Sequence, residues 1–135
     1  MIKVLSSRQY NQSLKATVQQ TGKLSFNVET GAALGLTSKK GVKFFMGGEP
    51  EQLCLAIMAE PDEDAFTLKK SGAYFTVEAK LLFDELGIDY KTYTVFYDLV
   101  RCKAYDAEAG GECYKMNYRP IPKKKSSNGE DVSDQ

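Results

Sequence analysis

Hydrophobic and polar residues alternate in several short segments of the chain, and a two-residue period is typical of strands with one buried face. The segment LSFNVE, for example, places Leu24, Phe26 and Val28 on one face. The run LCLAIMA is apolar throughout and predicts a fully buried strand. Together these patterns predict strands at residues 2–6, 14–19, 24–29, 41–46, 53–59, 65–70, 73–78 and 92–103.

Two segments depart from this alternation and predict short helices. Residues 30–36 (TGAALGL) are expected to form one or two turns that end at Gly35. Residues 79–86 carry apolar side chains at the spacing of one helix face, and Gly87 is expected to end this second helix.

The two halves of the chain resemble each other. The segment FNVETGAALGL at residues 26–36 is similar to FTVEAKLLFDELGI at residues 75–88, and Phe44-Phe45 matches Phe96-Tyr97. Each half therefore reads strand, strand, strand, short helix, strand, over residues 2–48 and 53–98. A period near fifty residues indicates an internal repeat, although chance similarity between short strands is the alternative. The pattern predicts a mainly β fold with short helices, in which two β-β-β-α-β units form a pseudo-two-fold barrel or curved sheet.

The rest of the chain has no counterpart in the first half. Residues 99–119 flank a turn at Gly110-Gly111 and predict a C-terminal β-hairpin extension. Pairing about this turn would bring Cys102 near Cys113; the alternative is that they are two unrelated buried or surface thiols. Residues 1–119 then form a single β-rich domain. Residues 120–135 are polar and charged, which predicts a disordered tail.

Composition excludes several functions. The 135 residues carry a formal net charge of zero, no histidine and three cysteines without CxxC spacing. The absence of imidazole removes the commonest general base and metal ligand, so we expect no enzyme, no catalytic residue, no metal site and no cofactor. The N-terminus lacks the apolar core of a signal peptide and no run is long enough to span a membrane. These features predict a soluble, cytoplasmic protein with no membrane partner.

Positive charge is nevertheless concentrated locally. Residues 99–125 hold seven Lys or Arg against three Asp or Glu, and tyrosines alternate with the cations. Cations that neutralise phosphates beside aromatic rings that stack on bases are typical of single-strand binding. Lysines near a turn at residues 39–43 form a second basic cluster. The predicted nucleic-acid-binding residues are Lys39, Lys40, Lys43, Arg101, Lys103, Tyr105, Tyr114, Lys115, Tyr118 and Arg119.

The stretch TGKLSFNVETGAALGLTSKKGVKFFMG resembles the AbrB/SpoVT-type DNA-binding unit. The resemblance covers Gly22, residues 24–28, 32–36 and 39–41, and the strand at 42–44, and a second copy begins at Gly72. It implies a barrel of two such units and contact with DNA. The family usually carries a proline and an arginine where this chain has Val28-Glu29, which removes the arginine contact from that position.

A second resemblance, to the Whirly and PUR single-strand-binding families, rests on the order GVKFFM, LCLAIMA, AFTLKK, AYFTVE and helix. Two functions thus stay open. One is a nucleic-acid-binding protein, such as a transcriptional regulator or single-strand DNA binder, with DNA or RNA as partner. The other is a structural or assembly protein of a virion or mobile element, which uses its β-hairpin arm to contact a protein partner or a second copy.

Overall fold

The computed structural model describes residues 1–4 and 14–123. The elements are β1 (Lys15–Val18), β2 (Lys23–Phe26), α2 (Val28–Leu34), η1 (Leu36–Ser38), β3 (Gly41–Gly47), β4 (Gln52–Met58), β5 (Phe66–Ser71), β6 (Tyr74–Glu78), α3 (Lys80–Glu85), β7 (Tyr93–Arg101), η2 (Lys103–Tyr105), α4 (Asp106–Ala109) and β8 (Glu112–Pro122). The predicted mainly β fold with short helices is confirmed.

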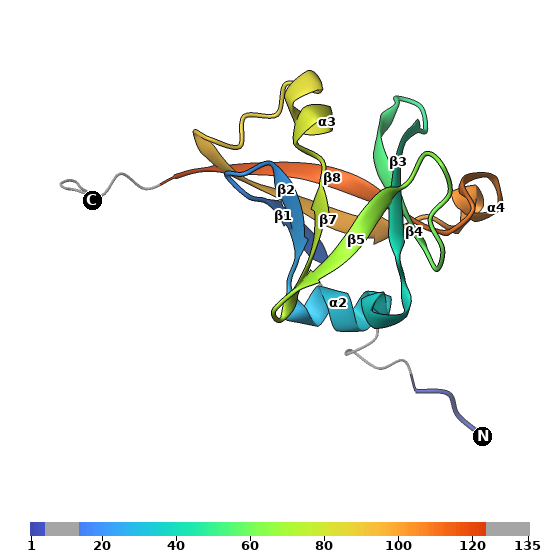
Figure 1. Ribbon diagram of the computed structural model, residues 1–135. Helices are drawn as coiled ribbons and strands as arrows, with labels where there is room; N and C mark the ends of the chain where they lie inside the picture. Colours follow the sequence, from blue (N-terminus) through green and yellow to red (C-terminus); the bar gives the residue numbers. More distant parts are fainter. Residues whose placement is uncertain (5–13, 124–135) are drawn as a thin grey trace.

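The strands form a closed antiparallel barrel in the order β1-β2-β6-β5-β3-β4-β8-β7. Figure 1 shows α2 at one end of this barrel and α3 at the opposite end, with α4 on one flank. Alternate residues of each strand point inward, and the buried core contains Leu24 and Phe26 from β2 and Leu55 and Ile57 from β4. Closure pairs strands that lie far apart in the sequence, such as β2 with β6 and β4 with β8.

Each half of the chain runs strand, strand, helix, strand, strand, which differs from the predicted β-β-β-α-β unit. The first strand was expected at residues 2–6; residues 2–4 form no strand, and residues 5 and 6 lie outside the described residues. The strand expected to open the second half is β4, which pairs with β3 along seven residue positions and completes the first half.

The segment predicted as a hairpin extension is part of the barrel. β7 and β8 pair from Tyr93↔Pro122 to Arg101↔Tyr114, and β8 also pairs with β4. The expected turn between them is replaced by η2 and α4. Because β8 continues to Pro122, it includes the first three residues of the predicted tail, and residues 124–135 lie outside the described residues.

Local sequence signals explain the helix ends. The Asn27 side chain accepts a hydrogen bond from the Thr30 backbone N–H at 2.8 Å and caps α2, which ends at Gly35 with a φ of 65°. Gly87 takes a φ of 75° directly after α3 and its C-cap. The buried side chain of α3 is Phe83, whose ring stacks on Tyr97 with centroids 6.3 Å apart. The helices therefore fill the two ends of the barrel with apolar side chains.

Candidate nucleic-acid interface

The ten residues predicted to bind nucleic acid do not lie on one continuous surface. Lys39 and Lys40 precede β3, and Lys43 lies within it. Arg101 ends β7, and Lys103 and Tyr105 belong to η2; the other four residues, Tyr114, Lys115, Tyr118 and Arg119, are spread along β8. The barrel therefore divides the predicted site into three regions.

In the first region, carboxylates already contact two of the three lysines. Lys43 forms an ion pair with Asp62, and Lys40 lies 3.6 Å from Glu60. The hydrogen bond from Lys43 to Asp62 raises the pKa of the lysine and lowers the pKa of the carboxyl group. A phosphate at Lys43 would have to displace Asp62.

In the second region, Arg101 is held by Asp106. Arg101 donates from Nη1 to Oδ1 at 2.8 Å and from Nη2 to Oδ2 at 2.7 Å, which is the strong bidentate geometry. The hydrogen bonds from Arg101 lower the pKa of Asp106 to about 2. The guanidinium also lies over the Tyr114 ring, and this tyrosine is buried in the core. Tyr114 therefore has no open face on which a base could stack.

The third region, on β8, is mixed. Arg119 donates to both Asp98 oxygens, at 2.8 and 3.0 Å, and its guanidinium lies 4.9 Å from the Phe96 ring centroid. Tyr118 is half exposed and its ring lies 5.8 Å from that of Tyr97. Lys115 is partly exposed on the same strand.

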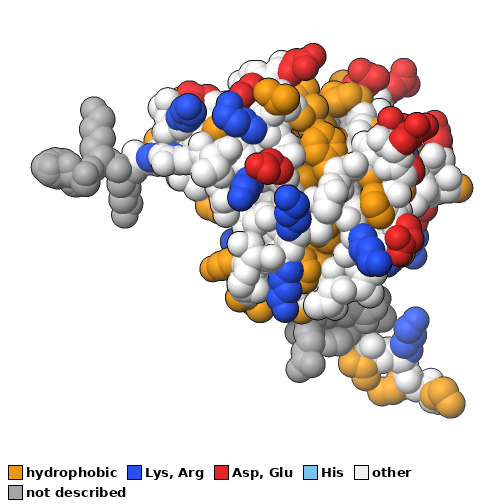
Figure 2. Space-filling model, viewed as in Figure 1, with side chains coloured by type: hydrophobic (Ala, Val, Ile, Leu, Met, Phe, Trp, Pro, Cys, Tyr) orange, Lys and Arg blue, Asp and Glu red, His pale blue; other side chains and the backbone are white. Residues whose placement is uncertain are grey.

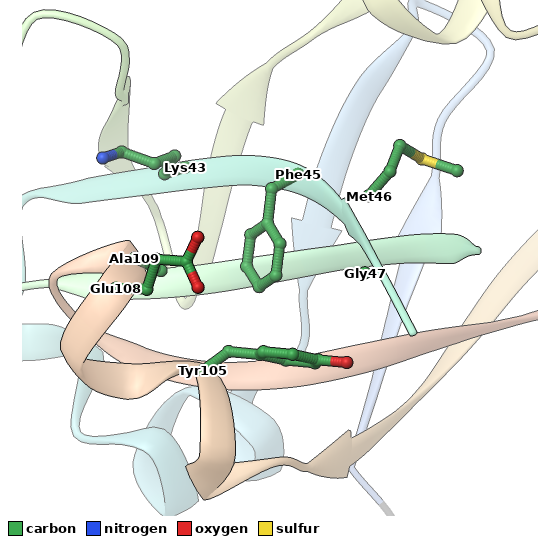
Figure 3. A pocket seen from close by; sticks show the side chains of 7 residues that line it. All are labelled: Lys43, Phe45, Met46, Gly47, Tyr105, Glu108 and Ala109. Atoms are coloured by element: carbon green, nitrogen blue, oxygen red, sulfur yellow. The ribbon is translucent and has the colours of Figure 1, made fainter. Parts of the chain in front are cut away.

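A small pocket joins the first two regions, with a volume of about 260 Å³. The rings of Phe45 and Tyr105 meet edge to face in this pocket, at an interplanar angle of 83°, and Figure 3 shows the Glu108 carboxylate beside them. The ring centroids are 5.7 Å apart. Lys43 lines the pocket but its side chain is directed away from the rings. Because the Glu108 carboxylate lines the pocket, the pocket is poorly suited to a phosphate.

A different surface carries lysines that the sequence prediction did not select. It is the outer face of five adjacent strands, β7, β1, β2, β6 and β5. One row of residues on the side away from the core crosses it in direct register: Phe96, Thr17, Ser25, Thr76 and Lys69. Lys69 is exposed, Phe96 and Thr17 are partly exposed, and Ser25 and Thr76 are buried, each with an exposed fraction of 8%. Arg119 of β8 extends the row, opposite Phe96. We call this surface the outer strand face.

Lysines flank the row on both sides. Lys15 lies beside Asp98, with its Nζ 5.9 Å from the Phe96 ring centroid, and Lys23 lies opposite Glu78. Within the described residues, Lys15, Lys23 and Lys69 make no ion pair within 4.0 Å. Figure 2 shows Lys and Arg side chains spread across the part of the surface that carries β1, β2 and β5. Acidic side chains gather instead along the upper and right edges of that view.

A weaker signal in the sequence marks these lysines. Lys15 and Lys23 are each the one lysine of their strand, and Lys69 precedes Lys70 in β5; all three take the phase opposite to the neighbouring core residues. A search for basic residues close together in the sequence selects residues 101–119 instead, because it cannot detect lysines on strands that become neighbours only in the folded barrel.

The described residues hold no group of three or more His, Cys, Asp or Glu side chains that could bind a metal ion. None of the helices in residues 1–4 and 14–123 has the length and apolar character that crossing a bilayer requires. Comparison of the chain with family models, with curated proteins and with solved structures gives no significant match.

Proposed function

We propose that this protein is a non-enzymatic, single-stranded nucleic-acid-binding protein that uses the outer strand face. The observation that supports it is the register of Phe96, Thr17, Ser25, Thr76 and Lys69 across five strands, flanked by unpaired Lys15 and Lys23. Lysines neutralise phosphates, and the partly exposed Phe96 ring beside Lys15 and Arg119 is the aromatic group of this face that a base could contact.

The charge of the face supports this function. The outer strand face carries four cations and two carboxylates, whereas the whole chain has a formal net charge of zero. The cations are Lys15, Lys23, Lys69 and Arg119, and the carboxylates are Asp98 and Glu78. A single strand fits this surface better than a duplex, because the described helices are at most seven residues long and bury side chains against the barrel. Reading a major groove needs a helix or a two-stranded ribbon that projects into it.

The test is fluorescence polarisation of a labelled oligothymidine and of a duplex of equal length at about 50 mM and about 200 mM salt. We expect the single strand to bind better. With three phosphate contacts, the affinity should fall roughly 20-fold between the two salt concentrations, since each contact contributes about 0.7 to the logarithmic slope.

Two triple variants with the same loss of charge locate the site. Lys15→Ala/Lys23→Ala/Lys69→Ala should abolish most of the salt-dependent binding. Lys39→Ala/Lys103→Ala/Lys115→Ala removes predicted residues elsewhere and should leave binding nearly unchanged. Equal losses in both variants would indicate binding without a defined site, and no binding at low salt would overturn the proposal.

We also propose that the two halves are duplicated AbrB-like units, revised to strand, strand, helix, strand, strand. The barrel order is unchanged when β1–β4 are exchanged with β5–β8, and Gly22 and Gly72 both take positive φ in the first turn of each half. If this is correct, residues 14–60 alone should assemble as a symmetric dimer, visible by sedimentation. An unfolded monomer at high concentration would contradict the duplication.

The assembly alternative has less support. Augmenting a neighbour's sheet needs a free strand edge, and β8 pairs with β4 only over residues 112–115. The remaining part of that β8 edge contains Pro120 and Pro122, which have no N–H to donate. Prolines at an edge oppose strand addition, so nucleic-acid binding remains the better-supported function.

A further inference from the structure

An open apolar groove of about 520 Å³ lies at the barrel end near α3. β3 and β4 contribute Met46, Gln52 and Leu53, the end of α3 and the following loop contribute Leu86 and Ile88, and β7 and β8 contribute Tyr97, Met116, Asn117 and Tyr118. In Figure 2, hydrophobic side chains gather between α3 and the tips of β3 and β4. This groove is separate from the outer strand face.

Tyr97 gives the groove a specific chemical feature. Its side chain lines the groove but is only 2% exposed. Among the described residues, the Tyr97 hydroxyl makes no hydrogen bond. Burial raises its pKa to about 12, so the hydroxyl stays protonated. A buried phenol without a partner destabilises the fold, and a ligand that hydrogen-bonds to it would recover part of this loss.

The other lining residues define the class of ligand. None of the lining side chains is charged, which disfavours an ionic ligand. Two methionines and two tyrosines offer polarizable and aromatic contacts, which suit a flat apolar ring system. The amide of Gln52 already donates to Asn117 at 3.0 Å, which leaves Tyr97 as the buried polar group in need of a partner. The volume lies within the range of small-molecule sites.

We propose that this groove binds a neutral, mainly apolar small molecule, such as an aromatic ring system with one hydrogen-bonding group, and that Tyr97 Oη bonds that group. The mouth of a barrel is a common position for such a site. Tyr97 is a ligand-contacting residue, and Leu86 and Tyr118 form part of the rim.

The test uses 2-naphthol and naphthalene, two probes that differ only by a hydroxyl group. Both are followed by their own fluorescence, because the chain has no tryptophan. We expect 2-naphthol to bind with a Kd on the order of 100 μM. In Tyr97→Phe, 2-naphthol should bind about three- to tenfold more weakly, which is the effect of one hydrogen bond, and naphthalene should bind as before.

A second pair of variants checks the position of the site. Leu86→Glu places a charge at the rim and should weaken both probes, whereas Leu81→Glu, on the exposed face of α3, should weaken neither. Tyr97→Phe should also melt at the same temperature as the unchanged protein or higher, because it removes an unpartnered hydroxyl.

Three results would overturn the proposal. The first is failure of 2-naphthol to bind at millimolar concentration. The second is equal binding of 2-naphthol to Tyr97→Phe and to the unchanged protein. The third is a marked loss of stability in Tyr97→Phe, which would show that the hydroxyl has a partner within the protein. Nucleic-acid binding should be the same in all four proteins, so the outcome is independent of the function proposed above.

Discussion

Arg101 and Asp106 form a bidentate ion pair at the point where the chain leaves β7 and folds back into β8. Asp106 Oδ1 also accepts the Cys113 backbone N–H at 3.0 Å, and Arg101 donates to the Cys113 carbonyl at 3.3 Å. One carboxylate therefore joins the end of β7, the first turn of α4 and the start of β8.

Replacing Asp106 should make the stability of the protein less dependent on pH in the acidic range. The pKa of Asp106 falls from 3.8 to about 2 on folding, so its ionised form stabilises the protein above about pH 4. This stabilisation is lost as the pH falls from about 4 to about 2. In Asp106→Asn the unfolding midpoint at pH 7 should be lower and the slope of stability against pH in that window should be smaller, as measured by urea titration.

Glu108→Gln provides the control, because it removes the same charge from the same helix but no hydrogen bond of Glu108 is present in the described structure. It should retain the acid dependence of the unchanged protein. If Asp106→Asn and Glu108→Gln gave the same pH profile, the ion pair would have no role in acid stability.

Phe83 should be among the most important side chains for stability. It is fully buried and contacts both Phe44 and Tyr97 through its ring. Phe83→Ala should lower the free energy of unfolding by about 3–5 kcal/mol, from lost burial and the resulting cavity. Leu81→Ala, two residues away and 82% exposed, should change it by less than about 0.5 kcal/mol. Chemical denaturation of both variants tests the difference, and equal effects would contradict the burial of α3.

Substitutions at two turn glycines should distinguish the cost of backbone strain from the cost of a steric clash. Gly22 and Gly72 both have positive φ, at 88° and 63°. A Cβ on Gly22 would lie 2.5 Å from the Lys80 Cβ, whereas a Cβ on Gly72 would meet nothing within 4 Å. Gly72→Ala should cost about 1–2 kcal/mol from backbone strain alone. Gly22→Ala should cost a further 1–3 kcal/mol or so, because α3 must move.

Thermal unfolding of the two glycine variants measures this difference. A larger loss in Gly72→Ala than in Gly22→Ala would contradict the close packing of the β1–β2 turn against α3.

The alternating pattern predicted most strands because each strand has one face in the barrel core. It could not predict closure, since the pairs β1–β7, β2–β6 and β4–β8 join residues far apart in the sequence. The sequence match of Phe44 with Phe96 is also wrong, because the two side chains lie on opposite sides of the barrel wall. Phe44 packs against Phe83 in the core, whereas Phe96 lies on the outer surface under Lys15 and Arg119. A shift of one residue reverses the face of a strand, so identity alone gave the wrong alignment there.

The candidate site was harder to predict for an electrostatic reason. Basic residues outnumber acidic ones within residues 99–125, but Arg119 forms an ion pair with Asp98 on the neighbouring strand. Lys43 likewise forms an ion pair with Asp62 in the loop between β4 and β5. The net charge of a segment therefore did not give the charge available to a ligand. The apolar run at residues 53–59 did predict a buried strand, and Cys54 of β4 is fully buried. Of the two alternatives for Cys102 and Cys113, the structure has the close one, since the Cys102 backbone N–H donates to the Cys113 carbonyl at 2.9 Å.

The three cysteines should react with iodoacetamide at very different rates. Cys102 is partly exposed, whereas Cys54 and Cys113 are fully buried. Burial raises the pKa of the Cys54 thiol, and it raises that of Cys113 from 9.0 to about 11. The thiolate is the reactive form, and such a rise reduces the thiolate fraction of Cys113 about 100-fold near neutral pH. Cys102 should therefore be labelled first in the folded protein.

Peptide mass spectrometry over a labelling time course distinguishes the three sites. In denaturant all three cysteines should react at similar rates, which controls for intrinsic differences between the peptides. In native buffer, labelling of Cys54 and Cys113 should be much slower than that of Cys102, because both buried thiols become accessible only when the surrounding structure opens. Native labelling of Cys113 as fast as that of Cys102 would contradict the burial of the Cys113 thiol.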